Sequence, residues 1–547
     1  MTTTLLKRTA TSLTMAAIAV TASAIPPKPG VVTVTQPDGT TFQAEIKGDA
    51  GFHWYVTPEG ELMAADGADG FIRNVSAEQL ETLRTRTLLN NEEARVKALR
   101  NKPARVAPAE IKRDFPTTGT VRGLIVLAEF QDVKFQPEST NEFFDAMVNQ
   151  QDFSSPETYG SVNDYFRAQS KGLFTPEFDI VGPVTLPRDR SSYGLVEDLD
   201  GLFRDAAYQA QKDFDVDFSR YDINDDQFVD FLFVIFAGHG EAQGGGAECI
   251  WPAMKDISDF VFDSFDGYYL GVAACSCELK GGEGTTREGA ATICHEFSHI
   301  LGLPDLYDSM GMGYGMGHYD IMCYGPYNDD GRTPCNYSAM EKFTLGWLTP
   351  TVLDSPVDNY TLRNFSETDE CVFIVNPENT NEYYTLENRQ LTGFDHALPG
   401  HGLLISYCNY DKSVWARNTV NSPSYSRYEH VRIMAADNVY NMLKGEDGDI
   451  WPGTTGNTAF TDTSAPAAIW YSKNKPVGMP VTNITEHEDG TVSFDFMSEN
   501  AAVDNIEATD IEAKYYNLQG LEVNPSALVP GIYICRKGSE ARRVVVR

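Results

Sequence analysis

Hydrophobic and polar residues follow a two-residue period in the first part of the chain. Short alternating stretches bounded by turn residues predict paired strands at residues 32–35, 41–44, 52–56 and 61–63. Residues 76–99 then follow a helical period, and Ser76 is a favourable N-cap for that helix. We therefore expect a small unit of strands and one helix near the N-terminus.

Strongly apolar strands alternate with helices in the middle of the chain. Residues 121–130 and 231–236 are nearly continuous apolar runs, which is typical of strands buried on both faces. Helical periods predict helices at about residues 141–150, 161–170 and 199–212. From about residue 355 the pattern changes to short strands separated by turn residues, which predicts a β-sandwich that extends to about residue 499.

The first 24 residues have the features of a secretory signal peptide. Lys7 and Arg8 precede an apolar run at residues 12–20, and Ala22, Ser23 and Ala24 form an A-x-A cleavage site. We expect cleavage before Ile25 and export of the remaining chain, although an ordinary N-terminal helix would also fit the apolar run. No other segment approaches the roughly 20 apolar residues of a membrane span.

Residues 25–113 carry equal numbers of basic and acidic residues, and the basic ones concentrate near the end of this stretch. A neutral folded unit followed by a basic linker is typical of a propeptide with a trypsin-type activation site at residues 95–113. An ordinary N-terminal domain is the alternative.

Charge and cysteine content exclude several classes of function. The chain has 547 residues and a formal net charge of −35, which argues against nucleic-acid binding and against docking on anionic lipid. Such acidity suits Ca²⁺, which prefers carboxylate oxygens. The nine cysteines include no C-x-x-C pair, so neither a cysteine-rich zinc ribbon nor a dense disulfide scaffold is expected.

The candidate chemistry lies in an H-E-x-x-H motif made by His295, Glu296 and His299. On a helix the two histidines are one turn apart and face the same way, so both imidazoles can hold one Zn²⁺. The longer side chain of Glu296 reaches a water at the metal without taking a ligand position.

A third ligand is expected a few residues beyond the motif. Gly302 would end the helix with a positive φ and turn the chain sharply, which returns Asp305 toward the metal. Asp308 is a nearby rival for this position. Three protein ligands leave one coordination position for water or substrate, as a catalytic zinc site requires.

A methionine follows in a predicted tight turn. Met322 matches the Met-turn of metzincins, which lies buried beneath the zinc as structural support and is not a ligand. Tyr324 lies two residues later, where some metzincins place a tyrosine that stabilises an oxyanion, although a core or surface tyrosine is the favoured interpretation. His318 is a weaker candidate for the same role.

These segments resemble the immune inhibitor A family of zinc metallopeptidases. The similarity is carried by HEFSHILGLPDLYD, YDIMCYG and NYSAMEKFTLGWL, and it extends to segments over about residues 117–497. The resemblance implies a metzincin-like catalytic domain with an attached β domain, secreted as a zymogen. It also implies His295, His299 and Asp305 as zinc ligands and Glu296 as general base, with the aspartate in place of the third histidine of most metzincins.

We therefore expect an α+β protein in which a metzincin-like zinc peptidase domain precedes a β-sandwich domain. The expected division is residues 1–24, signal peptide; 25–113, propeptide; 114–352, catalytic domain; 353–499, β-sandwich; and 500–547, a segment that resembles C-terminal sorting segments. The expected function is a secreted zinc metalloendopeptidase that acts on proteins or peptides and is activated by another protease. A catalytically silent binding protein or adhesin on the same scaffold is the alternative, but Glu296 and all the expected ligands are present.

Three further features complete the analysis. Residues 222–230 have oxygen ligands at alternate positions and could bind Ca²⁺ through Asp222, Asn224, Asp226 and Asp230, although the loop is not an EF-hand. Residues 274–280 could be either the edge strand that pairs with extended substrate or an internal strand. The expected propeptide has no cysteine, so inhibition must use an oxygen ligand, His53 or simple occlusion.

Overall fold

The computed structural model describes most of the chain. The described residues are 23–65, 67, 69–100, 115–258, 264–308, 313–422, 428–441, 446–498, 514–517, 522–525, 528–529, 531–537 and 540–546. The apolar run of the predicted signal peptide and most of the predicted basic linker lie outside these residues.

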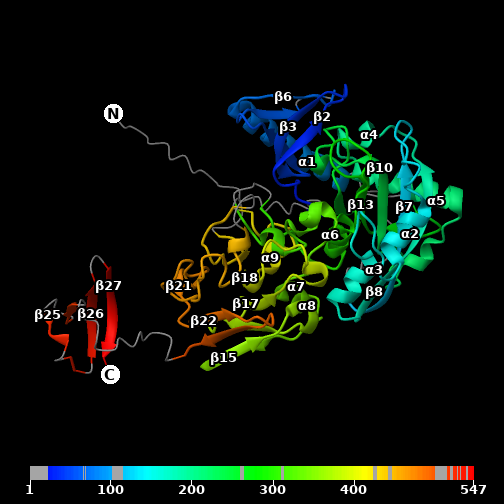
Figure 1. Ribbon diagram of the computed structural model, residues 1–547. Coiled ribbons are helices and arrows are strands. Elements are labelled where there is room, and N and C mark those ends of the chain that lie inside the picture. Colours follow the sequence, from blue (N-terminus) through cyan, green and yellow to red (C-terminus); the bar gives the residue numbers. More distant parts are fainter. Residues whose placement is uncertain are drawn as a thin grey trace, which may run out of the picture.

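A six-stranded sheet forms the centre of the largest unit (Figure 1). Its order is β1 (Ser23–Ala24), β11 (Ala253–Asp256), β13 (Val272–Leu279), β10 (Leu232–His239), β7 (Gly119–Glu129) and β8 (Phe174–Thr185). The four strands from β13 to β8 are parallel, whereas β11 is antiparallel to β13. The apolar runs predicted as buried strands are β7 and β10, and both are almost wholly buried, as parallel strands covered on two faces must be.

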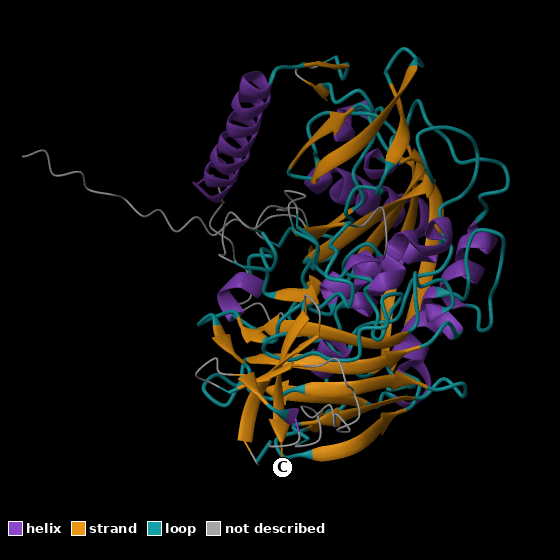
Figure 2. Ribbon diagram, turned by 60° about the vertical axis from the view of Figure 1, so that its left-hand side comes forward, coloured by secondary structure: helices purple, strands orange, loops and turns teal. Residues whose placement is uncertain are grey.

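Helices follow the predicted positions closely. They are α2 (Asn141–Asn149), α3 (Val162–Gln169), α5 (Leu199–Phe214) and α6 (Ala290–Ile300). The first three begin at side-chain caps on Thr140, Ser161 and Asp198. Helix α3 contacts both α2 and α6, so these three helices pack side by side against the sheet (Figure 2).

The N-terminal unit is a five-stranded antiparallel meander followed by one long helix. Its elements are β2 (Val31–Thr35), β3 (Thr41–Asp49), β4 (Phe52–Val56), β5 (Leu62–Ala65), β6 (Ile72–Asn74) and α1 (Ala77–Arg100). Ser76 and Gln79 bond each other's backbone amides, so the predicted cap is confirmed.

This unit contacts the large unit through backbone groups. The Thr35 amide donates to the Gly244 carbonyl at 3.1 Å. A Cβ on Gly244 would lie 2.3 Å from the Thr33 carbonyl oxygen, so only glycine permits this approach.

The C-terminal part of the main body is built from two sheets. One has the order β14 (Thr351–Val352), β16 (Cys371–Val375), β17 (Glu382–Arg389), β18 (Gly402–Asn409) and β19 (Val431–Ile433). The other has the order β15 (Val357–Leu362), β23 (Val492–Phe496) and β22 (Val481–Glu486). Residues of both sheets share one hydrophobic cluster, and the interpretation of this part as a β-sandwich stays a prediction.

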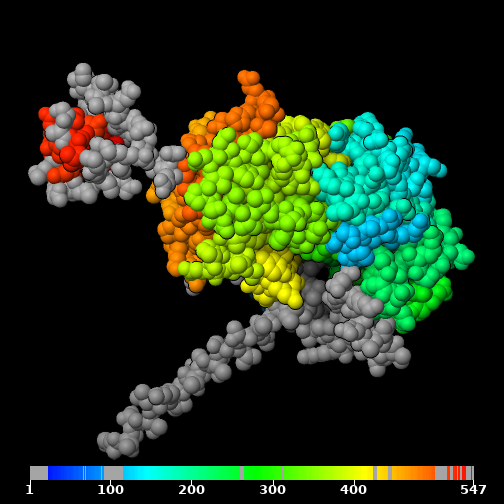
Figure 3. Space-filling view, turned by 90° about the horizontal axis from the view of Figure 1, so that it is seen from below, coloured from blue at the N-terminus to red at the C-terminus, as the bar shows by residue number. Residues whose placement is uncertain are grey.

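A separate four-stranded sheet ends the chain (Figure 3). Its order is β25 (Glu522–Val523), β24 (Lys514–Tyr516), β26 (Gly531–Lys537) and β27 (Glu540–Val546).

The remaining strands are β9 (Phe228–Val229), β12 (Tyr269–Leu270), β20 (Ile469–Trp470) and β21 (Lys475–Pro476). Short helices are α4 (Ser191–Gly194), α7 (Ala339–Thr344), α8 (Phe365–Thr368) and α9 (Lys412–Trp415), with 3₁₀ turns at Phe218–Tyr221, Glu241–Gln243, Gly317–Tyr319, Gly325–Gly331, Gly393–Asp395 and Glu446–Gly448.

A buried ion pair joins the two-sheet part to the predicted Met-turn region. Arg389 donates to both carboxylate oxygens of Asp395 at 2.7 Å, and it also bonds the carbonyls of Tyr319 and Asn336 at 3.2 and 3.3 Å. Both side chains of the pair are 0% exposed. The guanidinium therefore fixes the backbone just before Met322 from the other part of the molecule.

We predict that Asp395→Asn lowers the free energy of unfolding by about 3–5 kcal/mol, because it removes the carboxylate that pairs with two guanidinium nitrogens and leaves the buried cation only Glu387, 3.1 Å away. Urea denaturation of the full chain measures this. The matched control is Glu370→Gln, which removes the partner of Arg363 in a pair exposed by 65% and 36%, and which should cost less than about 1 kcal/mol. Equal losses in the two variants would contradict a bracing role for the buried pair.

Candidate metal centre

Helix α6 carries the predicted H-E-x-x-H motif and is buried along its entire length. Phe297 lies among aromatic rings, with its centroid 4.7 Å from that of Phe231 and 5.0 Å from that of Phe166. These contacts fix the rotation of the helix. His295 and His299 then lie one turn apart, with ring centroids 4.9 Å from each other.

Three side chains converge at this helix. Asp305 Oδ1 lies 3.2 Å from His295 Nε2 and 3.3 Å from His299 Nε2. Within the part of the chain that the structure describes, these are the only three His, Cys, Asp or Glu side chains whose ligand atoms all lie within 4.8 Å of one another. The structure therefore brings together the three residues that the spacing singled out.

The hydrogen bonds behind the imidazoles show which ring atoms are available. His295 Nδ1 donates to the Ile321 carbonyl and His299 Nδ1 donates to the Leu303 carbonyl, each at 2.8 Å. A carbonyl only accepts, so each Nδ1 carries a hydrogen, and in the neutral form of each ring the Nε2 presents a lone pair.

The two Nε2 atoms and Asp305 Oδ1 are buried and have no hydrogen-bond partner. Lone pairs that face one another in a dry site are unfavourable unless a cation lies between them. The donor set of two imidazoles and one carboxylate, with no fourth ligand among the described residues, suits a catalytic Zn²⁺.

A glycine and a distant asparagine position the aspartate. Gly302 has φ 98°, so the predicted turn after the helix is confirmed. Asn418 donates from its amide to Asp305 Oδ2 at 2.5 Å and accepts from the Asp305 backbone amide at 2.6 Å. This leaves Oδ1 directed at the histidines. The sequence offered no signal for Asn418, which lies 113 residues away.

Glu296 lies beside the three converging atoms without joining them. Its Oε1 accepts from the Ile25 backbone amide at 2.8 Å, and its Oε2 has no hydrogen-bond partner. Burial, together with the charge of Asp305, raises the pKa of Glu296 to about 8. A carboxyl group with a pKa in this range can both accept and release a proton near neutral pH.

Met322 lies in a buried turn beneath the histidines. Its backbone amide donates to Asp320 Oδ1 at 2.7 Å, and its carbonyl accepts from the Leu306 amide at 2.8 Å. The preceding carbonyl, of Ile321, holds His295. The turn therefore braces both the first histidine and the chain that follows Asp305.

The other candidate residues, Asp308, His318 and Tyr324, lie near the centre but make different contacts. Asp308 Oδ2 accepts from the Gly313 amide at 2.7 Å and is not among the converging atoms, which favours Asp305 over Asp308. His318 Nδ1 bonds Asn328 Oδ1 at 2.9 Å. Tyr324 is 6% exposed, and its ring centroid lies 6.1 Å from that of Tyr307.

The chain's own residues 23–28 lie across the candidate centre, which the sequence analysis did not foresee. Ser23 and Ala24 pair with Met254 and Ala253 of β11 as an added antiparallel strand. Ala24 and Ile25 are 2% and 1% exposed. The Ile25 amide reaches Glu296, and the Ala24 amide lies 3.5 Å from Asp305 Oδ2.

Three successive carbonyls of this segment each accept a hydrogen bond from a side chain of the large unit. Tyr307 Oη donates to the Ala24 carbonyl at 2.8 Å, Trp251 Nε1 to the Ile25 carbonyl at 2.9 Å, and Tyr327 Oη to the Pro26 carbonyl at 2.6 Å. The contacts are made mostly to backbone groups, so they are suited to peptides of different sequence.

Without the added strand β1, the edge of the sheet at the candidate centre is β11 and not the stretch at residues 274–280. Most of that stretch belongs to β13, which lies between β11 and β10 and is therefore internal. The parallel register of β13 with β10 accounts for its position, because both strands are strongly apolar.

Two other predictions concern residues away from this centre. In the predicted calcium loop, Asp222 accepts from the amides of Asp226 and Gln227 at 3.0 and 2.9 Å, and Asp230 accepts from the Ile223 amide at 2.6 Å. Burial, aided by neighbouring acids, raises the pKa of Asp230 to about 7. A calcium site at Asp222, Asn224, Asp226 and Asp230 stays a prediction.

His53 does not reach the centre. Its Nε2 bonds Glu241 Oε1 at 2.8 Å, at the contact between the N-terminal unit and the large unit. Its ring lies 4.9 Å from that of Trp251. Of the three modes of inhibition considered from the sequence, ligation by His53 is therefore excluded by its position in this structure.

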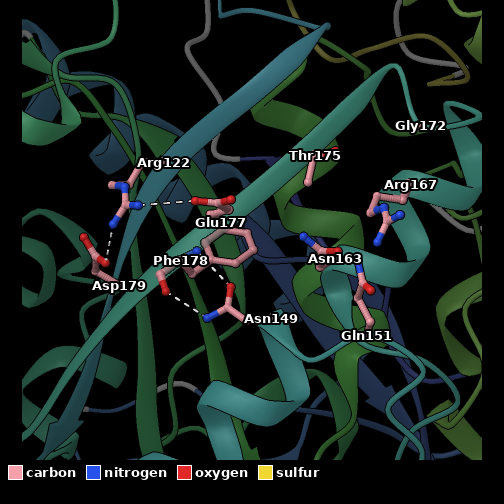
Figure 4. A pocket seen from close by; sticks show the side chains of 10 residues that line it. All are labelled: Arg122, Asn149, Gln151, Asn163, Arg167, Gly172, Thr175, Glu177, Phe178 and Asp179. Atoms are coloured by element: carbon pink, nitrogen blue, oxygen red, sulfur yellow. Dashed lines mark hydrogen bonds and ion pairs between the residues drawn. The ribbon is translucent and has the colours of Figure 1, made fainter.

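A hollow on the opposite edge of the sheet has a different character (Figure 4). It lies along β7 and β8. There Arg122 of β7 is paired with two residues of β8, Asp179 at 2.8 Å and Glu177 at 3.3 Å. Its other polar side chains are amides, one threonine and Arg167. None of the residues that converge at α6 lines it, and it offers no comparable metal or acid–base set.

We predict that zinc binding depends on Asp305 and on the contact that orients it. Asn418→Ala should weaken zinc affinity about 10–100-fold, as expected for a partner behind the ligand, and Asp305→Asn should weaken it more. Competition with a chromophoric chelator measures the affinity, and Asp308→Asn is the control that should bind like the wild type. A loss in Asp308→Asn equal to that in Asp305→Asn would contradict the assignment.

Comparisons with known proteins agree with this geometry. Residues 125–347, less than half of the chain, match the family model for the catalytic domain of the immune inhibitor A peptidase family, M6. The chain is 23% identical over 253 residues to the pre-pro-metalloprotease PrtV of Vibrio cholerae serotype O1, covering 39% of this chain and 27% of that protein. It is 26% identical over 269 residues to immune inhibitor A of Bacillus thuringiensis subsp. alesti, covering 40% of this chain and 38% of that protein.

The chain therefore spans between about a quarter and two fifths of the length of these curated relatives. Among the described residues, no helix is both long and apolar enough to cross a bilayer. The matched stretch contains α6, the converging side chains and the Met-turn. Residues 125–347 are thus similar to the catalytic domain of the immune inhibitor A peptidases.

Proposed function

We propose that this protein is a secreted zinc metalloendopeptidase that hydrolyses peptide bonds in proteins and is made as a zymogen. One observation carries the proposal: three buried ligand atoms without hydrogen-bond partners converge beside a carboxylate, and that carboxylate contacts a peptide nitrogen. The names of the relatives, a metalloprotease and an immune inhibitor, support the same class.

The residues divide the chemistry between them. His295, His299 and Asp305 would hold Zn²⁺, which supplies a Lewis acid and lowers the pKa of water in the site. Glu296 would accept a proton from the attacking water and deliver it to the leaving nitrogen. The 2.8 Å contact between Glu296 Oε1 and the Ile25 nitrogen supports this role, because it places the carboxylate within hydrogen-bond distance of the nitrogen of a bound peptide.

An extended substrate would bind as residues 23–26 do. Its residues before the cleaved bond would pair with the edge strand β11, and its carbonyls after that bond would accept from Trp251 and Tyr327. Backbone recognition of this kind suits the hydrolysis of many protein substrates.

Latency would follow from the same contacts. If the signal peptide is removed before Ile25, the new N-terminus begins where the Ile25 nitrogen contacts Glu296. The N-terminal unit, residues 25–113, would act as a propeptide that keeps this segment in place and blocks the cleft by occlusion. Removal would require a protease that cuts the basic linker.

The remaining assignments complete the proposal. Residues 114–352 would be the catalytic domain, residues 353–499 a β-sandwich that braces it, and residues 500–547 a sorting-like segment. Export would deliver the protein outside the cell, in free form or held at the surface.

We predict that limited trypsin treatment within residues 100–114 converts the inactive full chain into a peptidase. Cleavage of denatured casein should appear only after the cut, and a zinc chelator should abolish it. Glu296→Gln keeps the shape of the side chain but not its basicity, so it should bind zinc normally and lose about 10²–10⁴ in rate. A cut protein that binds one zinc but cleaves no denatured protein would favour a binding role instead.

We predict that the N-terminal unit binds the rest of the chain less tightly at alkaline pH. Burial alone would lower the pKa of His53, but the Glu241 carboxylate raises it to about 9. The ion pair therefore contributes fully below about pH 6.5, the ordinary value, and its contribution is lost as the pH rises through about 9.

Size-exclusion chromatography of the trypsin-cut protein measures how much of the N-terminal unit stays bound to the rest of the chain. After the cut the N-terminal unit should dissociate from the rest of the chain at pH 7, and it should do so more readily near pH 10. Glu241→Gln should release it about tenfold or more easily at pH 7 and flatten the pH dependence, whereas Glu45→Gln, on the exposed side of β3, should behave like the wild type. Unchanged retention in Glu241→Gln would contradict the role of the pair.

A further inference from the structure

The peptide group between Ala24 and Ile25 is bound at both of its polar atoms. Its nitrogen donates to Glu296 Oε1 at 2.8 Å, and its carbonyl oxygen accepts from Tyr307 Oη at 2.8 Å. Both contacts are buried, and Tyr307 is 6% exposed.

The chemistry of peptide hydrolysis gives these two contacts different meanings. The nitrogen of the cleaved bond must receive a proton when it leaves, which is the role proposed for Glu296. The carbonyl oxygen gains negative charge when water attacks the carbon. A hydrogen-bond donor placed at that oxygen stabilises the charge more strongly than it stabilises the neutral substrate.

We infer that Tyr307 is a catalytic residue whose hydroxyl donates a hydrogen bond to the carbonyl oxygen of the bond that is hydrolysed. This inference rests on the proposed peptidase function. Water adds to the carbonyl carbon, the C=O electron pair moves to the oxygen, and the Tyr307 hydroxyl keeps its proton while it donates the hydrogen bond. Glu296 takes the proton from water and passes it to the nitrogen as the C–N bond breaks.

The backbone holds Tyr307 firmly at this place. It lies two residues after Asp305, in the segment that the Gly302 turn brings back to α6. The Leu306 amide, directly before it, donates to the Met322 carbonyl at 2.8 Å. The same segment thus supplies a candidate ligand and the proposed donor.

The sequence pointed to Tyr324 for this role, because some metzincins have a tyrosine two residues after the Met-turn methionine. Here the contact to the carbonyl comes from Tyr307, and Tyr324 packs beside it. Within the described residues the Tyr324 hydroxyl makes no contact with the peptide at residues 23–26, so the geometry favours Tyr307.

Tyr327 provides a matched comparison. Its hydroxyl also donates to a peptide carbonyl, that of Pro26 at 2.6 Å, but this carbonyl lies two residues beyond the carbonyl of the bond in question and stays planar throughout. The loss of that hydroxyl should therefore weaken binding of substrate and transition state equally.

The test compares Tyr307→Phe, Tyr327→Phe and Tyr324→Phe in the trypsin-cut full chain, with zinc content and thermal unfolding measured for each. Tyr307→Phe should lower kcat about 10²–10³-fold with little change in KM. Tyr327→Phe should raise KM several-fold with kcat nearly unchanged, and Tyr324→Phe should stay within about threefold of the wild type.

A second measurement does not depend on activity, and its crystallographic part needs no variant. A phosphinic analogue of Ser-Ala-Ile-Pro, tetrahedral at the Ala–Ile position, should bind Tyr307→Phe weaker than the wild type by a factor similar to the loss in kcat. In a crystal structure of the wild-type complex, Tyr307 Oη should lie within hydrogen-bond distance of a phosphinyl oxygen.

A kcat for Tyr307→Phe within threefold of the wild type, a loss carried by Tyr324→Phe instead, or a phosphinyl group out of reach of Tyr307 would overturn the inference. An inactive wild type would instead refute the peptidase function itself, so the two failures are distinguishable.

Discussion

Three lone pairs that meet in a dry interior impose the central constraint on this molecule. The Nε2 atoms of His295 and His299 and the Oδ1 atom of Asp305 face one another without a hydrogen-bond donor. Such an arrangement is costly in a protein interior unless a cation balances it. The surrounding elements can be understood as the supports that hold it: aromatic rings against Phe297, backbone carbonyls behind each imidazole, and Asn418 behind the aspartate.

These supports come from widely separated parts of the chain. The Met-turn carbonyls come from the same domain, whereas Asn418 follows α9 in the C-terminal part. The buried pair of Arg389 and Asp395 ties that C-terminal part to the backbone before Met322. The two-sheet part therefore contributes directly to the geometry of the centre, and its attachment is a structural requirement of the site.

The N-terminal segment uses the cleft as a peptide ligand would. It adds a strand to β11, places one amide at Glu296 and offers three successive carbonyls to Tyr307, Trp251 and Tyr327. Because these are contacts to main-chain atoms, the same donors that hold this segment can hold a substrate. Occlusion and substrate binding are then two uses of one surface.

Local patterns predicted the local parts of this structure. The strands β7 and β10, the cap of α1 and the turn at Gly302 follow from periodicity and residue chemistry within a few positions. The H-E-x-x-H spacing likewise pointed to the two histidines, and the expected turn at Gly302 pointed to Asp305, with Asp308 as its rival. Contacts across long separations could not be predicted in this way, because nothing near Ala24 or Asn418 signals a partner more than 100 residues away. The edge position of β11 also depends on sheet order, which the individual strand patterns leave open.

Anomalous scattering at the zinc absorption edge, from crystals of the full chain, tests the central claim most directly. The account predicts one peak at about 2.0–2.2 Å from His295 Nε2, His299 Nε2 and Asp305 Oδ1, the distances usual for zinc and these ligands. No peak at that place in crystals grown with zinc, or a peak held by other residues, would contradict it.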